Sequence, residues 1–187
     1  IIWVGQVIID PHDTLDGRFV FDYVISKIYK GDIEKINYFL AGEIKWYNIQ
    51  ELFFPKNILH YVLNNKQFYF VNDISVKLLS YFSFYFLAKS LHISTFNSAL
   101  GGILYSTLVY IKVPLGLAIP AAPYILYLLL NKDTLNKKHY FFLFLIGLNS
   151  SLIQDIFPFI LLIPLSFLLK NKNKNLKIYL QVLLVII

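Results

Sequence analysis

Cysteine and methionine are absent from the 187 residues of this chain, and Arg18 is its only arginine. The lack of cysteine excludes disulfides and thiolate metal sites. The sequence also contains no glycine-rich phosphate loop, no catalytic Ser-His-Asp order and no zinc-binding His-Glu helix. No basic face of the kind that binds nucleic acid is present, so we expect no nucleic-acid partner.

Charged residues are scarce, at 15% of the chain, while 57% of the residues are hydrophobic and the net charge is +6. Several apolar runs approach the length that crosses a bilayer. In chain order they are Asp73–Ala88, Phe96–Ile111, Leu115–Leu130, Tyr140–Gln154 and Ile156–Leu169. A soluble domain of this size could not bury all of them in one core. The sequence therefore predicts an all-α fold, a polytopic transmembrane helix bundle.

The chain opens and closes in apolar sequence without an initial methionine, as we expect of an N-terminal fragment. We predict one transmembrane domain over residues 1–187. Residues 1–9 would end a first span, residues 10–72 would form a large extracytoplasmic loop, and residues 73–187 would contain further spans, the last one truncated. The expected location is the cell membrane, where the partner of the apolar runs is the lipid bilayer.

Lysines set this orientation, because lysine-rich connections of a multi-pass protein face the cytoplasm. The connections on that side contain Lys89, Lys132, Lys137, Lys138, Lys170, Lys172, Lys174 and Lys177. The alternate short connections contain only Lys112. Residues 140–169 have two interpretations. One long tilted helix would place the last four lysines outside, whereas a hairpin broken at Asp155 and Pro158 keeps them inside.

The predicted loop 10–72 contains two segments with helical period. In Gly17–Lys30, one stripe holds Val20, Val24 and Ile28, and Asp32–Tyr47 repeats the pattern. Both are predicted to be amphipathic helices that lie on the membrane surface.

A cluster of charge opens the same loop. Residues 10–18 read Asp-Pro-His-Asp-Thr-Leu-Asp-Gly-Arg, which places three carboxylates, an imidazole and the single arginine directly after an apolar run. Ionisable side chains next to a membrane are costly, and this favours a functional role.

This acidic motif, the surface helices and the many short apolar runs together resemble the GT-C superfamily of integral-membrane glycosyltransferases. The stretch His12-Asp13-Thr14-Leu15-Asp16 is similar to the first-loop acidic motif of its bacterial members. The resemblance implies a sugar donor linked to polyprenyl phosphate and an extracytoplasmic glycan, lipid or protein as acceptor. It also implies an acidic residue that acts as base or metal ligand.

Such a transfer needs a base for the acceptor hydroxyl and a cation for the departing phosphate. We predict Asp13 as the catalytic base and Asp16 as a second catalytic carboxylate. The same two carboxylates would hold a divalent cation, Mg²⁺ or Mn²⁺. Arg18 would clamp the donor phosphate. The other predicted substrate-binding residues are His12, Gln154 and Asp155, the last two only if residues 140–169 form the hairpin.

Simpler roles stand beside these. Asp16 could cap the helix that begins near Gly17, and Arg18 could form an exposed ion pair with Asp22. Two other function classes remain, a transporter or flippase of lipid-linked saccharides and a non-catalytic membrane module. The run Leu115–Leu130 contains no charged residue, which favours chemistry at the membrane surface over transport.

Overall fold

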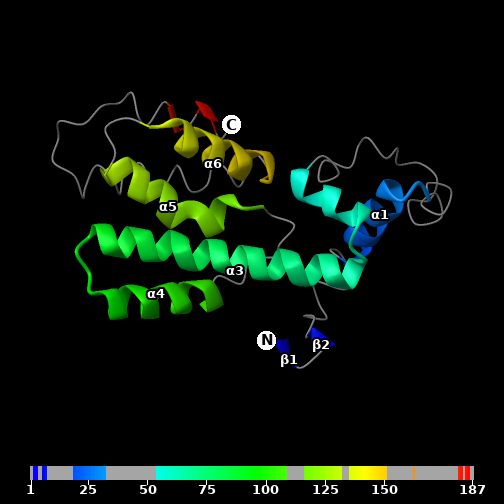
Figure 1. The fold of residues 1–187 in the computed structure, drawn as a ribbon, viewed down its shortest axis with the longest axis horizontal. Helices are drawn as coiled ribbons and strands as arrows, with labels where there is room; N and C mark the ends of the chain where they lie inside the picture. The colour runs from blue at the N-terminus through cyan, green and yellow to red at the C-terminus, as the bar shows by residue number, and fades with distance from the viewer. Residues whose placement is uncertain are drawn as a thin grey trace. The chain divides into compact units, whose positions relative to one another are not determined.

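The computed structural model describes residues 2–3, 6–7, 19–32, 54–108, 116–131, 135–150, 162, 181–182 and 184–185, with the backbone alone at residues 2–3, 6–7, 19–22 and 108. The chain divides into two compact units, Ile1–Ile74 and Ser75–Ile187. Figure 1 shows the helices and strands of both units.

Unit 1 begins with a short β-hairpin. β1 (Ile2–Trp3) pairs antiparallel with β2 (Gln6–Val7), so that Ile2 lies opposite Val7 and Trp3 opposite Gln6. The prediction that residues 1–9 end a transmembrane helix is therefore wrong. Isoleucine, valine and tryptophan favour extended backbone, and an apolar run alone does not distinguish a strand from a helix.

The rest of unit 1 is helical. α1 (Phe19–Tyr29) contacts η5 (Pro55–Tyr61), a 3-10 helix. Val24 and Ile25 of α1 are buried, and Ile28 packs against them. α1 confirms the helix predicted over residues 17–30. The second predicted surface helix, over residues 32–47, lies outside the described residues from position 33 on.

α3 (Asn65–Ser90) begins in unit 1 and continues into unit 2. A reciprocal pair of hydrogen bonds fixes its start. The Gln67 amide N–H donates to Asn64 Oδ1 at 2.9 Å, and the Asn64 amide N–H donates to Gln67 Oε1 at 3.1 Å. This capping box satisfies two backbone donors that the helix itself leaves open.

Unit 2 adds three shorter helices, α4 (Thr95–Leu108), α5 (Ala118–Asn131) and α6 (Lys137–Leu148). α5 and α6 share an apolar core that includes Ile125, Leu128 and Leu143, and Leu87 of α3 packs against it. Asn136 and His139 form a second capping box at the start of α6. The core thus lies on the side of α3 that faces α5. α4 packs on a different side of α3, the one that carries Tyr81 and Phe84 (Figure 1).

Hydroxyl groups connect the elements of unit 2. The Tyr105 hydroxyl of α4 donates to the Ile119 carbonyl of α5 at 2.9 Å, and burial raises the pKa of Tyr105 to about 12. Ser150, two residues beyond α6, accepts the backbone N–H groups of Leu117 and Ala118, each at 3.0 Å. These bonds hold the start of α5 against α4 and the end of α6.

In the described part of the chain, no helix combines the length and the apolar character needed to cross a bilayer. The predicted polytopic transmembrane helix bundle is therefore contradicted. α4 and α5 have 14 residues each and α6 has 12, so they extend about 18–21 Å against about 30 Å of hydrocarbon. α3 has 26 residues but is interrupted by polar ones. They include Lys66, Gln67, Asn72, Asp73, Lys77, Ser80, Ser83 and Lys89.

Candidate functional site

The site residues predicted from the sequence all lie outside the described residues. They are His12, Asp13, Asp16, Arg18, Gln154 and Asp155. Their predicted roles in catalysis, substrate binding and divalent-cation binding therefore stay predictions. Within the described ranges, no group of three or more metal-ligating side chains gathers.

The described chain offers a different candidate, the helical hairpin of α3 and α4. The turn between the two helices closes α3 with a Schellman motif. The Ile93 amide N–H donates to the Ala88 carbonyl and the His92 amide N–H to the Lys89 carbonyl, both at 3.1 Å. His92 has φ 62°, in the left-handed region that this motif requires and that glycine usually occupies. The chain then reverses direction, and α4 begins at Thr95.

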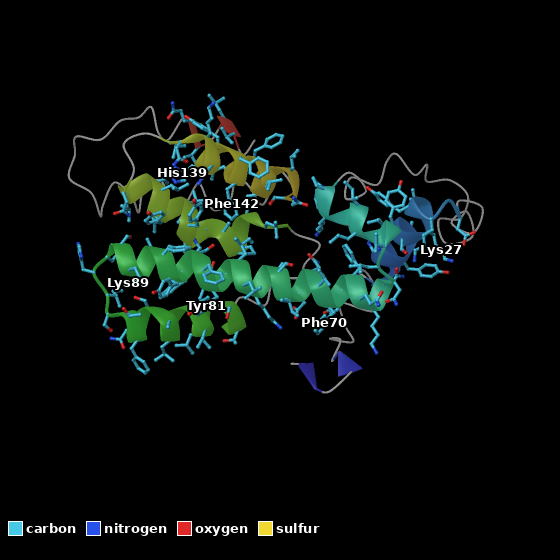
Figure 2. The ribbon with its side chains drawn as sticks, in the orientation of Figure 1. Lys27, Phe70, Tyr81, Lys89, His139 and Phe142 are labelled. Carbon is cyan, nitrogen blue, oxygen red and sulfur yellow. The ribbon has the colours of Figure 1, made fainter. Side chains whose placement is uncertain are left out.

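Two glycines let the helices of this hairpin approach closely. A methyl group at Gly102 would lie 2.8 Å from Tyr81 Cδ2 and 3.0 Å from the Tyr81 carbonyl oxygen. One at Gly101 would collide with the ring of Phe84. Phe84 in turn stacks on Tyr105, with ring centroids 5.6 Å apart. Tyr81 therefore lies on the side of α3 that faces α4 (Figure 2).

Away from this contact, both helices of the hairpin leave large apolar side chains exposed. On α3 they follow one row at i, i+4 spacing, and on α4 they occupy the same side of the helix over two turns. We call them the apolar face, which consists of Leu78, Phe82, Phe86, Phe96, Leu100, Ile103 and Leu104. Phe96 is the most open, with 76% of its surface exposed. Large apolar side chains exposed in such number on one hairpin indicate a contact with a membrane or another macromolecule.

Hydroxyl groups near the apolar face are satisfied by their own helix. Ser106 donates to the Ile103 carbonyl at 2.8 Å, and Thr107 bonds the carbonyls of Ile103 and Leu104 at 3.1 and 3.0 Å. Ser98 likewise donates to the Ser94 carbonyl at 2.8 Å. Such back-bonding removes the need for water or for a polar partner. The α4 side chains can therefore enter a nonpolar environment without leaving a hydroxyl unpaired.

The charge of unit 2 is one-sided. Its described residues contain four lysines, Lys77, Lys89, Lys137 and Lys138, and no aspartate or glutamate. Figure 2 shows Lys89 at the end of α3 that turns into α4. The Lys89 ammonium donates to Thr95 Oγ1 at 3.1 Å across that turn. Lys89 is thus bonded to the first residue of α4, which directly precedes Phe96 in the sequence.

A buried histidine in unit 1 is the other unusual polar group. His60 is fully buried, stacks on Phe68 and has no hydrogen-bond partner at either ring nitrogen. Burial, with smaller contributions from Lys30 and Lys56, lowers the pKa of His60 to about 4. The imidazole is therefore neutral near pH 7, and it serves as a packing group of the unit 1 core.

The apolar face was not predicted from the sequence. The available signal was the row of apolar residues on α4, which was interpreted as part of a membrane span. Comparison of the chain with protein-family models, with curated proteins and with solved structures finds no match. What the hairpin does is therefore argued from its own geometry and chemistry.

Proposed function

We propose that this protein works in contact with a lipid bilayer, with the apolar face of the α3–α4 hairpin against the acyl chains. The observation that carries this proposal is the exposure of the seven large apolar side chains on one helical hairpin. Withdrawing a single phenylalanine or leucine side chain from water contributes about 1.5–3 kcal/mol. Several such side chains together supply more than enough free energy to hold the hairpin in the outer hydrocarbon layer.

Two further features favour lipid over a protein partner. Protein interfaces ordinarily contain about one hydrogen bond per 100–200 Å², whereas the hydroxyls of Ser106 and Thr107 are already bonded to their own helix. In addition, the described residues of unit 2 carry lysines without carboxylates. That charge suits the anionic surface of a bilayer.

For the reaction, we propose sugar transfer from a polyprenyl-phosphate-linked donor to an extracytoplasmic acceptor. This rests on the sequence alone, on the motif from His12 to Asp16 and on Arg18. The loss of the transmembrane bundle removes the architectural half of the resemblance, so the motif is what supports the proposal. A donor carried on a lipid tail is reached only at a membrane, which makes a lipid-contact surface useful to such an enzyme.

Vesicle binding tests the lipid contact. The full chain is floated with phosphatidylcholine vesicles, which carry no net charge, and compared with Phe96→Asp. Loss of about 2 kcal/mol of apolar contact predicts binding weaker by about thirtyfold. Phe96→Leu is the matched control and should bind nearly as the parent does, and circular dichroism should show equal helix content in all three. A parent chain that stays unbound, or an Asp variant that floats equally well, contradicts the proposal.

A separate assay tests the chemistry. Membranes containing the parent chain or Asp13→Asn are supplied with a polyprenyl-phosphate sugar donor, and transfer to endogenous acceptors is measured at matched protein levels. Transfer should occur with the parent and fall at least a hundredfold in the variant, as expected for loss of a general base. Equal transfer by both would remove Asp13 from the mechanism. No transfer by either would contradict the enzyme and favour the non-catalytic module or the transporter.

A further inference from the structure

The turn of the α3–α4 hairpin combines exposed apolar and cationic groups within one short stretch. We call residues 89–96 the hairpin tip. Leu91, Ile93 and Phe96 are exposed there, and so are the side chains of Lys89 and His92. No carboxylate interrupts the stretch. Apolar side chains that can enter the hydrocarbon layer therefore lie in the same short stretch as the Lys89 cation and the His92 imidazole, which can stay at headgroup depth.

The backbone of the tip is closely determined. The two hydrogen bonds of the Schellman motif fix the direction in which residues 91–93 leave α3. On the other side, Ser94 accepts the Asn97 amide N–H at 3.3 Å and the Ser98 amide N–H bonds the Ser94 carbonyl at 2.9 Å. These bonds define the backbone of the tip, so the backbone needs little ordering when the tip binds.

Two side chains of the tip, Lys89 and His92, can donate hydrogen bonds to a ligand. Glycine would relieve the left-handed backbone at position 92, yet the residue there is a histidine with an exposed imidazole. Lys89 is held over the turn by its bond to Thr95 Oγ1. An ammonium has three N–H donors, so two others are directed outward from that bond.

We infer that the hairpin tip binds the phosphate group of an anionic phospholipid, through the Lys89 ammonium and the His92 imidazole, while Leu91, Ile93 and Phe96 enter the acyl layer. This inference rests on the proposed contact of the hairpin with a bilayer and adds its preferred lipid. Both donors suit a phosphate oxygen, and the apolar neighbours place that phosphate at the depth of a lipid headgroup.

The test uses the full chain and two kinds of vesicle, phosphatidylcholine alone and phosphatidylcholine mixed with phosphatidylglycerol. The parent should bind the mixed vesicles severalfold more tightly, and the difference should shrink as salt is added. Lys89→Gln should lower affinity for the mixed vesicles about fivefold and should lower affinity for pure phosphatidylcholine much less, because choline neutralises the charge of its phosphate. Lys66→Gln, which removes the same charge from the first turn of α3, is the matched control and should change neither.

The outcomes separate the two proposals. Failure of the parent to bind phosphatidylcholine alone contradicts the bilayer contact itself. Binding to both vesicles with equal affinity, or equal effects of Lys89→Gln and Lys66→Gln, overturns the anionic-lipid site and leaves the bilayer contact intact. Soluble glycerol phosphate is added at constant ionic strength to test the source of the phosphate. Displacement of the protein from mixed vesicles by this compound would show a site for free phosphate and overturn the assignment to lipid.

Discussion

The hydroxyl of Tyr105 completes the hydrogen bonding of Ile119, a residue on a different helix. In an uninterrupted helix the N–H of residue 123 would bond the carbonyl of residue 119. Position 123 of α5 is a proline, which has no N–H to give. The Tyr105 hydroxyl of α4 donates to this carbonyl instead, at 2.9 Å. A proline inside α5 thus creates an acceptor that ties α4 to α5.

This relationship predicts a coupling between two substitutions. Tyr105→Phe should lower the free energy of unfolding by about 1–2 kcal/mol, because the Ile119 carbonyl loses its donor. In a Pro123→Ala background the new alanine N–H can supply that bond, so the same substitution should then cost much less. Thermal unfolding followed by circular dichroism measures both, with Tyr85→Phe as a control for the loss of a phenolic hydroxyl. Equal costs in the two backgrounds would refute the coupling.

Ser150 offers a second test of how unit 2 is held together. Its hydroxyl oxygen accepts the N–H groups of Leu117 and Ala118 and donates to the Ile146 carbonyl at 2.8 Å. Ser150→Ala should destabilise the protein by about 2–3 kcal/mol, because two donors at the start of α5 lose their acceptor. Ser106→Ala removes a hydroxyl that bonds only its own helix and should cost much less. Urea unfolding of the two variants measures this difference. Equal midpoints would contradict the prediction.

The sequence predicted the positions of the helices better than their ends. Helical periodicity over residues 17–30 corresponds to α1, and the run Leu115–Leu130 corresponds to α5 (Ala118–Asn131) within three residues at each end. The predicted run Tyr140–Gln154 continues past the end of α6 at Leu148. A hydropathy pattern predicts which residues are apolar enough to be buried, but it does not predict where a helix ends and the backbone changes direction. That change depends on the bond between Ser150 and residues 32 and 33 positions earlier, which no local pattern contains.

The exposure of the apolar side chains of α4 could not be predicted from the sequence either. An apolar row on a helix predicts burial against something, and a transmembrane bundle was one way to achieve it. The structure instead places Phe96 and Leu100 at the surface of a hairpin whose inner side is closed by Gly101 and Gly102 against α3. Of the candidate site, Lys89 was predicted to lie in a connection between two spans, whereas it lies in the last turn of α3.

Glycine at position 92 should stabilise the hairpin. His92 occupies a left-handed conformation that costs a side-chain-bearing residue about 1 kcal/mol. His92→Gly removes that cost but makes the unfolded chain more flexible, so the expected net gain is about 0.5 kcal/mol, or a rise of about 1–2 °C in Tm. His92→Ala keeps the strain and should show no gain. An equal rise in Tm for Gly and Ala would mean that the backbone conformation is not the cause.

Stability of unit 1 should depend on pH through His60. An unfolded histidine has a pKa near 6.5, whereas burial lowers that of His60 to about 4. Between these values the unfolded chain binds more protons than the folded one, so stability is present above about pH 6.5 and is lost as the pH falls toward 4. By pH 5 the loss should reach about 2 kcal/mol.

Tryptophan fluorescence can isolate this effect, because Trp3 and Trp46, the two tryptophans of the chain, both belong to unit 1. Urea midpoints at pH 7 and pH 5 should therefore differ for the parent. His60→Leu should remove most of the difference without lowering stability at pH 7, because the imidazole nitrogens of His60 have no hydrogen bonds to lose. His92→Gln, which changes an exposed histidine, should leave the difference in place. A parent whose midpoint is the same at both pH values would show that the imidazole becomes charged without unfolding the core, which its full burial without a hydrogen-bond partner argues against.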